Sequence, residues 1–201
     1  MSSVQARRTY WAQKLEDRNA HIGAVPNAVH RAIADFDRAG FVRLVVTQNV
    51  DGLHRVSGIS DERIVELHGS NMEIECQSCH TLSDPTPHFE RFSSTNQPPV
   101  CYCGGFLKPA TVSFGQSLKV SNLDRAVRAA EDAELVVALG TTLFVEPAAS
   151  LPLLAARRGA RYIIVNHGKT GHDGLPDVTL RIHGDVTELI PPAAAQVLAH
   201  F

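Results

Sequence analysis

The stretch FVRLVVTQNVDGLHRVSGISDERIVELHGS, residues 41–70, contains two short apolar runs, each followed at once by polar residues. Phe41–Thr47 is apolar and β-branched, which predicts a strand buried on both faces. The polar residues that follow it include Gln48, Asn49 and Asp51. The second run, 64–67, leads into His68. Open α/β sheets bind ligands beyond the carboxyl ends of their strands, so this stretch indicates a functional edge.

A plainer interpretation of the same stretch is also open. Asn49, Asp51 and Gly52 are residue types that form turns and helix caps without any ligand. Position in a fold does not establish function, so the stretch alone does not decide between a binding edge and a simple turn.

The composition is that of an ordinary globular protein. The chain has 201 residues, of which 44% are hydrophobic and 20% charged, which argues against disorder. A net charge of −2 gives no electrostatic support for a nucleic-acid or anionic-membrane partner. No apolar run approaches the roughly 20 residues that span a bilayer. The first thirty or so residues lack the apolar core of a signal peptide, and we expect a cytoplasmic protein.

Helical and strand patterns alternate along most of the chain. Helices are expected at 4–17, 27–40, from about 51, 121–132, 147–158 and 186–198. Strands are expected at 41–47, 64–67, 111–114, 135–139, 161–165 and 179–182. In the first helix, Ser2 or Ser3 would be the cap, and Tyr10 and Trp11 would pack inward. Such alternation predicts an α/β fold with a parallel, doubly wound sheet.

Between Glu75 and Leu107 this periodicity is lost, and all four cysteines lie there. A span of that length without a core of its own needs a cross-link. We therefore expect two domains. One comprises 1–73 and 108–201, and the other is a small inserted module at 74–107.

The cysteines form two close pairs, Cys76 with Cys79 and Cys101 with Cys103. Two such pairs can place four thiolates around zinc, in a closed site with a structural role. One alternative is two disulfides, although disulfides are uncommon in a chain without a secretory signal. A second alternative is that both pairs are free, unreactive thiols. His80 is a possible substitute ligand that we take as a bystander.

Three further expected strands end in small or polar residues. These are Gly140, Thr141 and Thr142, then Asn166, and finally Gly184, Asp185 and Val186. Each group alone is typical of a turn or cap. Together with 48–51 they give four strand ends at one edge, which indicates a nucleotide crevice.

Several motifs resemble those of the Sir2 family, the sirtuins. They are TQNVDGLH at 47–54, ELHG at 66–69, the four cysteines, KPATVSFGQ at 108–116 and LGTTLFVEP at 139–147. The resemblance implies a Rossmann-like NAD-binding fold of the DHS type with a zinc-ribbon-like module. It also implies NAD-dependent protein-lysine deacylation, in which the acyl group passes to ADP-ribose and nicotinamide is released.

The sequence departs from the family pattern in three places. The glycine-rich GAGIS-type segment and the PDFR-like stretch are absent, so we expect an N-terminally truncated fold that lacks its first unit. The second cysteine pair is C-x-C where C-x-x-C is more usual, and Gly104 and Gly105 would supply the permissive backbone. GTT replaces GTS, which keeps the hydroxyl.

The resemblance also implies roles for individual residues. His68 would be the catalytic base. Gln48, Asn49 and Asp51 would face the nicotinamide and its ribose. Gly140, Thr141, Thr142, Asn166 and the Val186 backbone would hold the adenosine half of NAD. Cys76, Cys79, Cys101 and Cys103 would hold Zn²⁺. Val112, Phe114, Gly115 and Val145 would flank an acyl-lysine peptide by strand addition.

Alternatives to this function remain open from the sequence. The chain could be a catalytically impaired, zinc-stabilised binding module, or a protein ADP-ribosyltransferase that uses the same cofactor. Val112, Phe114 and Val145 could equally be core or edge residues. The expected partner is an acyl-lysine protein or peptide, with no nucleic acid and no membrane.

Overall fold

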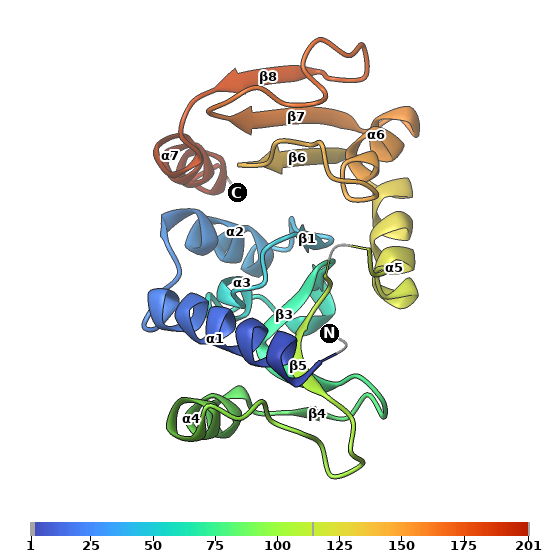
Figure 1. Cartoon of the computed structure of the whole chain (residues 1–201). Coiled ribbons are helices and arrows are strands. Elements are labelled where there is room, and N and C mark those ends of the chain that lie inside the picture. The colour runs from blue at the N-terminus through green and yellow to red at the C-terminus, as the bar shows by residue number, and fades with distance from the viewer. Residues whose placement is uncertain (1–2, 114, 201) are drawn as a thin grey trace. The chain divides into compact units, whose positions relative to one another are not determined.

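The computed structural model describes residues 3–113 and 115–200, which form two compact units (Figure 1). The first comprises Met1–Val25, Asn49–Gly52 and His68–Ser117, and the second comprises Pro26–Gln48, Leu53–Leu67 and Leu118–Phe201. The segment 74–107 falls within the first unit, while the domain limits expected from the sequence stay a prediction. No helix in the described part of the chain has the length and apolar character needed to cross a membrane.

The first unit is built on an antiparallel sheet. Its elements are α1 (Val4–His21), β3 (Gly69–Cys76), β4 (Leu82–Ser83), α4 (Pro85–Thr95) and β5 (Leu107–Thr111). The strand order is β4-β3-β5, and both pairings are antiparallel. Ser3 caps α1 as predicted, since its side chain accepts a hydrogen bond from the Ala6 amide at 3.1 Å.

Trp11 is the centre of this unit's core. Its side chain is 1% exposed, and its Nε1 donates to the Leu107 carbonyl at 3.1 Å. The ring packs against Phe89 and Phe92, with centroids 5.0 and 5.9 Å away. Both phenylalanines come from α4, so the expectation of a span without regular periodicity between 75 and 107 was wrong at this helix. Its start could have been found, because Asp84 is an N-cap before a proline.

The second unit contains the parallel strands. Its elements are α2 (Ala28–Arg38), β1 (Val45–Thr47), α3 (Leu53–Val56), the 3₁₀ turn η1 (Asp61–Arg63), β2 (Ile64–Glu66), α5 (Val120–Glu131), β6 (Leu135–Leu139), α6 (Ser150–Arg157), β7 (Arg161–Asn166), β8 (Leu180–His183) and α7 (Val186–Leu198). The parallel pairings β1-β2 and β6-β7-β8 form two sheets rather than the single sheet expected. The predicted α/β class is confirmed.

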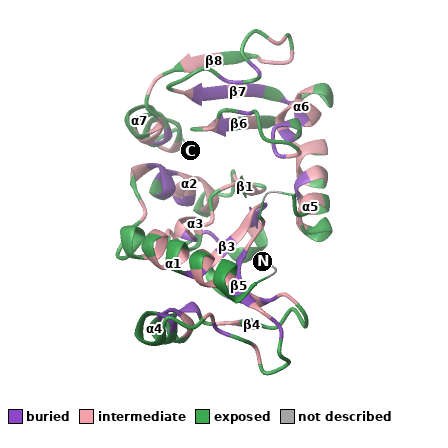
Figure 2. Ribbon diagram, viewed as in Figure 1, coloured by how far each residue is buried: buried purple, intermediate pink, exposed green. Residues whose placement is uncertain are grey.

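The strand that was expected to be buried on both faces, β1, is partly exposed, and so is β6. β1 begins only at Val45, because Phe41 completes the end of α2: its amide donates to the Phe36 carbonyl at 3.0 Å, and the two rings meet edge to face. Val46 of β1 is 39% exposed, and Leu135 of β6 is 52% exposed. Among the described strands, β1 pairs only with β2 and β6 pairs only with β7, so the side chains of β1 and β6 are partly open to solvent. β7, between two partners, is largely buried (Figure 2).

The strand expected at 111–114 lies earlier in the chain, as β5 at Leu107–Thr111. The prolyl residue Pro109 sits inside this strand and pairs with Ile74 across the ladder. A proline within the strand is the reason that periodicity placed its start too late. Phe114 lies outside the described residues.

His172 anchors the connection between β7 and β8 in the core of the second unit. It is 5% exposed, and its Nδ1 lies 2.9 Å from the hydroxyl of Tyr162, which is fully buried. Burial lowers the pKa of His172 below its usual value, although Glu146 and Asp177 act in the opposite direction. The folded chain therefore favours the neutral ring.

We predict that the second unit loses stability as the pH falls below about 6.5, the ordinary histidine pKa. Above that value the contribution of His172 is fully present. Below it the unfolded chain binds the proton more readily than the folded chain, so the free energy of unfolding declines towards the lower folded pKa. His172→Gln keeps a polar partner for Tyr162 but does not titrate. Urea unfolding of both chains, followed by circular dichroism between about pH 5 and pH 7.5, should give the flatter profile for the variant; equal slopes would contradict the assignment.

Candidate functional site

His68 directly precedes β3, and its backbone is fixed by the end of β5. The His68 carbonyl accepts a hydrogen bond from the Val112 amide at 2.8 Å. The next residue, Gly69, has φ +75°, and a Cβ there would lie 2.0 Å from the Ala110 carbonyl oxygen. Only glycine permits both the left-handed conformation and this approach. The histidine is thereby held at a defined point beside β5.

The segment that carries Asn49 and Asp51 packs against β3. The Asn71 amide of β3 donates to the Val50 carbonyl at 2.8 Å. Asn71 lies in β3, three residues after His68, so the structure brings His68, Asn49 and Asp51 to one part of the first unit.

The second unit presents the other predicted cofactor residues at the carboxyl ends of its strands. Gln48, which follows β1, donates from Nε2 to Thr141 Oγ1, just beyond β6, at 3.3 Å. Gly140 has φ +59°, and its amide donates to the Val165 carbonyl at 3.0 Å. Because β6, β7 and β8 are parallel, their ends share one edge.

Three loops meet at this edge. The Gly171 amide donates to the Thr142 carbonyl at 2.8 Å, which joins the loop after β6 to the loop after β7. A Cβ at Gly140 would lie 3.7 Å from Val186 Cγ2, at the start of α7. Asn166 ends β7, and its side-chain amide donates to the Gly168 carbonyl at 3.1 Å. The predicted adenosine residues are therefore neighbours in the second unit.

The predicted peptide-flanking residues lie in irregular segments. Val112 follows β5 and donates to the His68 carbonyl. Gly115 has φ +82°, with open space where a Cβ would be. Val145 is 44% exposed. Phe114 is outside the part of the chain that the structure describes.

Sequence reasoning missed a buried lysine beside this segment. Lys108 is 3% exposed, and its Nζ donates to the Thr111 carbonyl at 2.6 Å, to Gln116 Oε1 at 2.8 Å and to Ser113 Oγ at 3.2 Å. Burial lowers its pKa, which the carboxylate of Glu75 partly opposes. A lysine enclosed in the apolar run Leu107–Ala110 is the signal that could have revealed it.

The four cysteines form a compact cluster in the first unit. All four are free thiols, and their Sγ atoms lie within 4.8 Å of one another. Cys76 and Cys103 are 3.5 Å apart, and Cys79 and Cys101 are 3.8 Å apart. Zinc with Zn–S bonds of about 2.3 Å in a tetrahedron separates its sulfurs by about 3.8 Å. The residues present fit a zinc ion, and His80 instead bonds Glu75 Oε1 at 2.9 Å.

The electrostatics of the four thiols also support a zinc site. The Thr81 hydroxyl and amide lower the pKa of Cys79 to about 6. The Gly105 amide lowers the pKa of Cys103, but contacts with the other three thiols outweigh it and raise the value to about 12. Four thiolates this close repel one another, so a divalent cation is needed for all four to ionise. Glycine is required at 105, where a Cβ would lie 2.7 Å from Cys76 Sγ.

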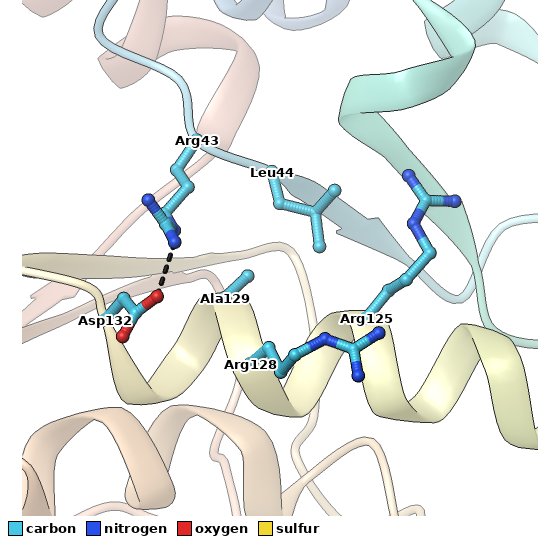
Figure 3. A pocket seen from close by; sticks show the side chains of 6 residues that line it. All are labelled: Arg43, Leu44, Arg125, Arg128, Ala129 and Asp132. Atoms are coloured by element: carbon cyan, nitrogen blue, oxygen red, sulfur yellow. Dashed lines mark hydrogen bonds and ion pairs between the residues drawn. The ribbon is translucent and has the colours of Figure 1, made fainter.

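A shallow pocket in the second unit is lined by several basic side chains (Figure 3). Three arginines line it, and Arg43 is paired with Asp132 at one side. Arg125 donates to the Glu62 carbonyl at 2.7 Å, so that guanidinium is also engaged within the unit. None of the predicted site residues lines this pocket.

Comparison with known sequences gives one family. The sequence model of the Sir2 family matches residues 1–147. NAD-dependent protein deacetylase 2 of Streptomyces coelicolor is 39% identical over 182 residues, which are 90% of this chain and 75% of that protein.

Comparison of folds gives the same family. A structure described as a Sir2 homologue–NAD complex has a TM-score of 0.84 and 30% identity, and covers 96% of this chain and 73% of the other. A structure described as Sir2 bound to acetylated peptide has a TM-score of 0.80 and 32% identity, with 90% and 73% covered.

We predict one zinc per chain, bound through the four thiolates. Cys101→Ser should lose the metal and lower the thermal stability of the first unit, because three thiolates leave the site open and the end of β3 loses its cross-link to the segment 101–103. His80→Asn is the matched control, since His80 has φ +59°, which asparagine tolerates, and it should retain full zinc. Elemental analysis and thermal unfolding measure both; a wild-type chain that is stable without metal would refute the site.

Proposed function

The chain belongs to the Sir2 family, and we propose that it is an NAD-dependent protein-lysine deacylase. It would transfer the acyl group from an acyl-lysine side chain to ADP-ribose and release nicotinamide. The observation that carries this proposal is the 39% identity, over 90% of the chain, to a protein named NAD-dependent protein deacetylase. The acetylated peptide in the structure of a relative supports an acyl-lysine peptide as the substrate class.

His68 is the residue that we assign to proton transfer. Histidine is the side chain best suited to accept a proton near neutral pH, and here it would do so at a ring nitrogen. Its main chain is fixed on one side by the Val112 amide and on the other by the close approach of Gly69 to Ala110. A fixed base avoids the entropic cost of orienting it during the reaction.

NAD, when bound, supplies an electrophilic ribose carbon and a leaving group in nicotinamide. We assign Asn49 and Asp51, on the segment packed against β3, to that end of the cofactor, together with Gln48. The adenosine end is assigned to the edge formed beyond β6, β7 and β8. Its residues are Gly140, Thr141, Thr142, Asn166 and Val186. The contact of Gln48 with Thr141 at 3.3 Å supports a shared role for the residues at this edge.

The acyl-lysine peptide is assigned to the segments around Val112, Phe114 and Gly115 and around Val145. Exposed main chain can pair with an extended peptide, so strand addition is the recognition mode we propose. The cysteine cluster has no part in the chemistry, because four protein ligands complete the coordination of a zinc ion.

The test is the release of nicotinamide from NAD by the purified chain, with an acetyl-lysine peptide and with the same peptide unmodified. We expect release only with the acetylated peptide. His68→Gln keeps a polar side chain that cannot accept the proton, and it should lower the rate about 10²- to 10⁴-fold. His21→Gln is the control, because His21 is an exposed residue at the end of α1 whose Nδ1 lies 2.7 Å from the Asp17 carbonyl oxygen.

Three results would contradict the proposal. They are full activity in His68→Gln, release that does not depend on acylation, and retention of the ADP-ribose label on protein, which would indicate ADP-ribosyl transfer instead. Zinc content should be the same in the wild type and both histidine variants, so that a loss of activity is not confused with a loss of the fold.

A further inference from the structure

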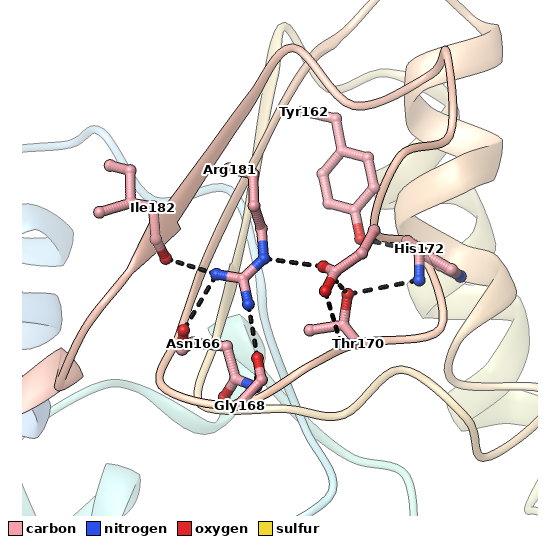
Figure 4. A network of polar contacts seen from close by, with 8 residues as sticks. Tyr162, Asn166, Gly168, Thr170, His172, Arg181 and Ile182 are labelled. Carbon is pink, nitrogen blue, oxygen red and sulfur yellow. Dashed lines mark hydrogen bonds and ion pairs between the residues drawn. The ribbon is translucent and has the colours of Figure 1, made fainter.

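The loop between β7 and β8 is held by one arginine on β8 (Figure 4). Arg181 is only 14% exposed at its side chain. Its Nη1 donates to the Asn166 carbonyl at 2.9 Å, and its Nη2 donates to the Gly168 carbonyl. The Gly168 carbonyl also accepts the Asn166 side-chain amide, so both ends of the short turn 166–168 are fixed.

The same guanidinium reaches the far part of the loop through Asp173. Arg181 Nε donates to Asp173 Oδ1 at 2.8 Å. That carboxylate also accepts the Thr170 hydroxyl at 2.6 Å and, on its other oxygen, the Thr170 amide at 3.0 Å. These hydrogen bonds hold the pKa of Asp173 well below its usual range. The carboxylate is thus ionised at neutral pH and links Arg181 to the second half of the loop.

The loop is joined to the predicted cofactor edge at two points. The Gly171 amide donates to the Thr142 carbonyl, and the Gly184 amide, before α7, donates to the Asn166 carbonyl at 3.4 Å. Arg181 therefore fixes a loop that contains Asn166 and bonds Thr142, two of the residues assigned to adenosine. A planar guanidinium can make these bonds at once, whereas an ammonium cannot.

We propose that Arg181 is a positioning residue for the adenosine half of NAD. It acts by holding the Asn166–Asp173 loop in a single conformation, so that the binding edge is formed before the nucleotide arrives. The inference rests on the proposed function and adds to it a residue that touches no reacting atom. Preorganisation lowers the entropic cost of binding, so its loss should affect affinity for ADP-ribose rather than the chemical step.

Arg181→Met tests this inference, because it keeps a long apolar stem and removes all the donors. We expect hydrogen–deuterium exchange to quicken in the Asn166–Asp173 loop, with β6 and β7 unchanged. The dissociation constant for ADP-ribose, measured by calorimetry, should rise about tenfold or more. The KM for NAD should rise by a similar factor, with kcat and the KM for the peptide close to the wild-type values.

Two variants accompany it. Arg181→Lys should give exchange rates and an ADP-ribose dissociation constant between those of the wild type and Arg181→Met. Asp173→Asn keeps the arginine but should also loosen the loop, so it tests the inference even if Arg181→Met does not fold. Arg158→Met is the matched control, since Arg158 is an exposed arginine of the same unit paired with Glu131. It should leave both exchange and affinity unchanged.

The results separate this inference from the proposed function. If Arg181→Met and Asp173→Asn bind ADP-ribose as the wild type does, the positioning role is refuted while the deacylase proposal stands. If a fall in kcat with unchanged affinity is found, the role is likewise refuted. If the wild type binds no ADP-ribose and releases no nicotinamide, the proposed function fails, and the positioning role with it.

Discussion

The close approach of Gly69 to Ala110 is the constraint on which the first unit depends. With φ +75° and no side chain, Gly69 lets the main chain of β3 meet β5 where any other residue would place a Cβ 2.0 Å from a carbonyl oxygen. The two strands then pair from Gly69 opposite Thr111 to Cys76 opposite Leu107. His68 precedes one end of this ladder, and Cys76, one of the four predicted zinc ligands, stands at the other. Zinc bound there would stabilise the strand that positions the proposed base.

The second unit uses side chains for a similar purpose. Its loops beyond β6 and β7 have no ladder of their own, and they are fixed instead by Thr142, by Arg181 and by the buried pair of Tyr162 and His172. The polar bonds are short-range and directional, so each loop has one favoured arrangement. A rigid edge of this kind is what a nucleotide site requires, since most of its contacts come from loops.

The sequence predicted those features that depend on local chemistry. The cysteine spacing indicated a four-thiolate cluster, and the cap of the first helix was predicted to be Ser2 or Ser3, because both features depend on residues close together in the chain. Contacts between distant residues were not predictable. The exposure of Val46 depends on what its strand pairs with, and the burial of Lys108 and the partners of Arg181 depend on how loops fold back. The roles of His68 and the cofactor residues come from the family resemblance, because no local pattern distinguishes them from turns and caps.

The most direct measurement compares two glycine substitutions in the first unit, Gly69→Ala and Gly23→Ala. Both positions have a positive φ, of +75° and +80°, but nothing lies within 4 Å of a Cβ at Gly23. Urea unfolding of the zinc-loaded chains can be followed through Trp11, the single tryptophan, which is buried in that unit. Gly23→Ala should lower the free energy of unfolding by about 1–2 kcal/mol, the cost of the left-handed conformation alone. Gly69→Ala should lower it by clearly more. Equal decreases in the two variants would show that the contact with Ala110 does not set the position of β3.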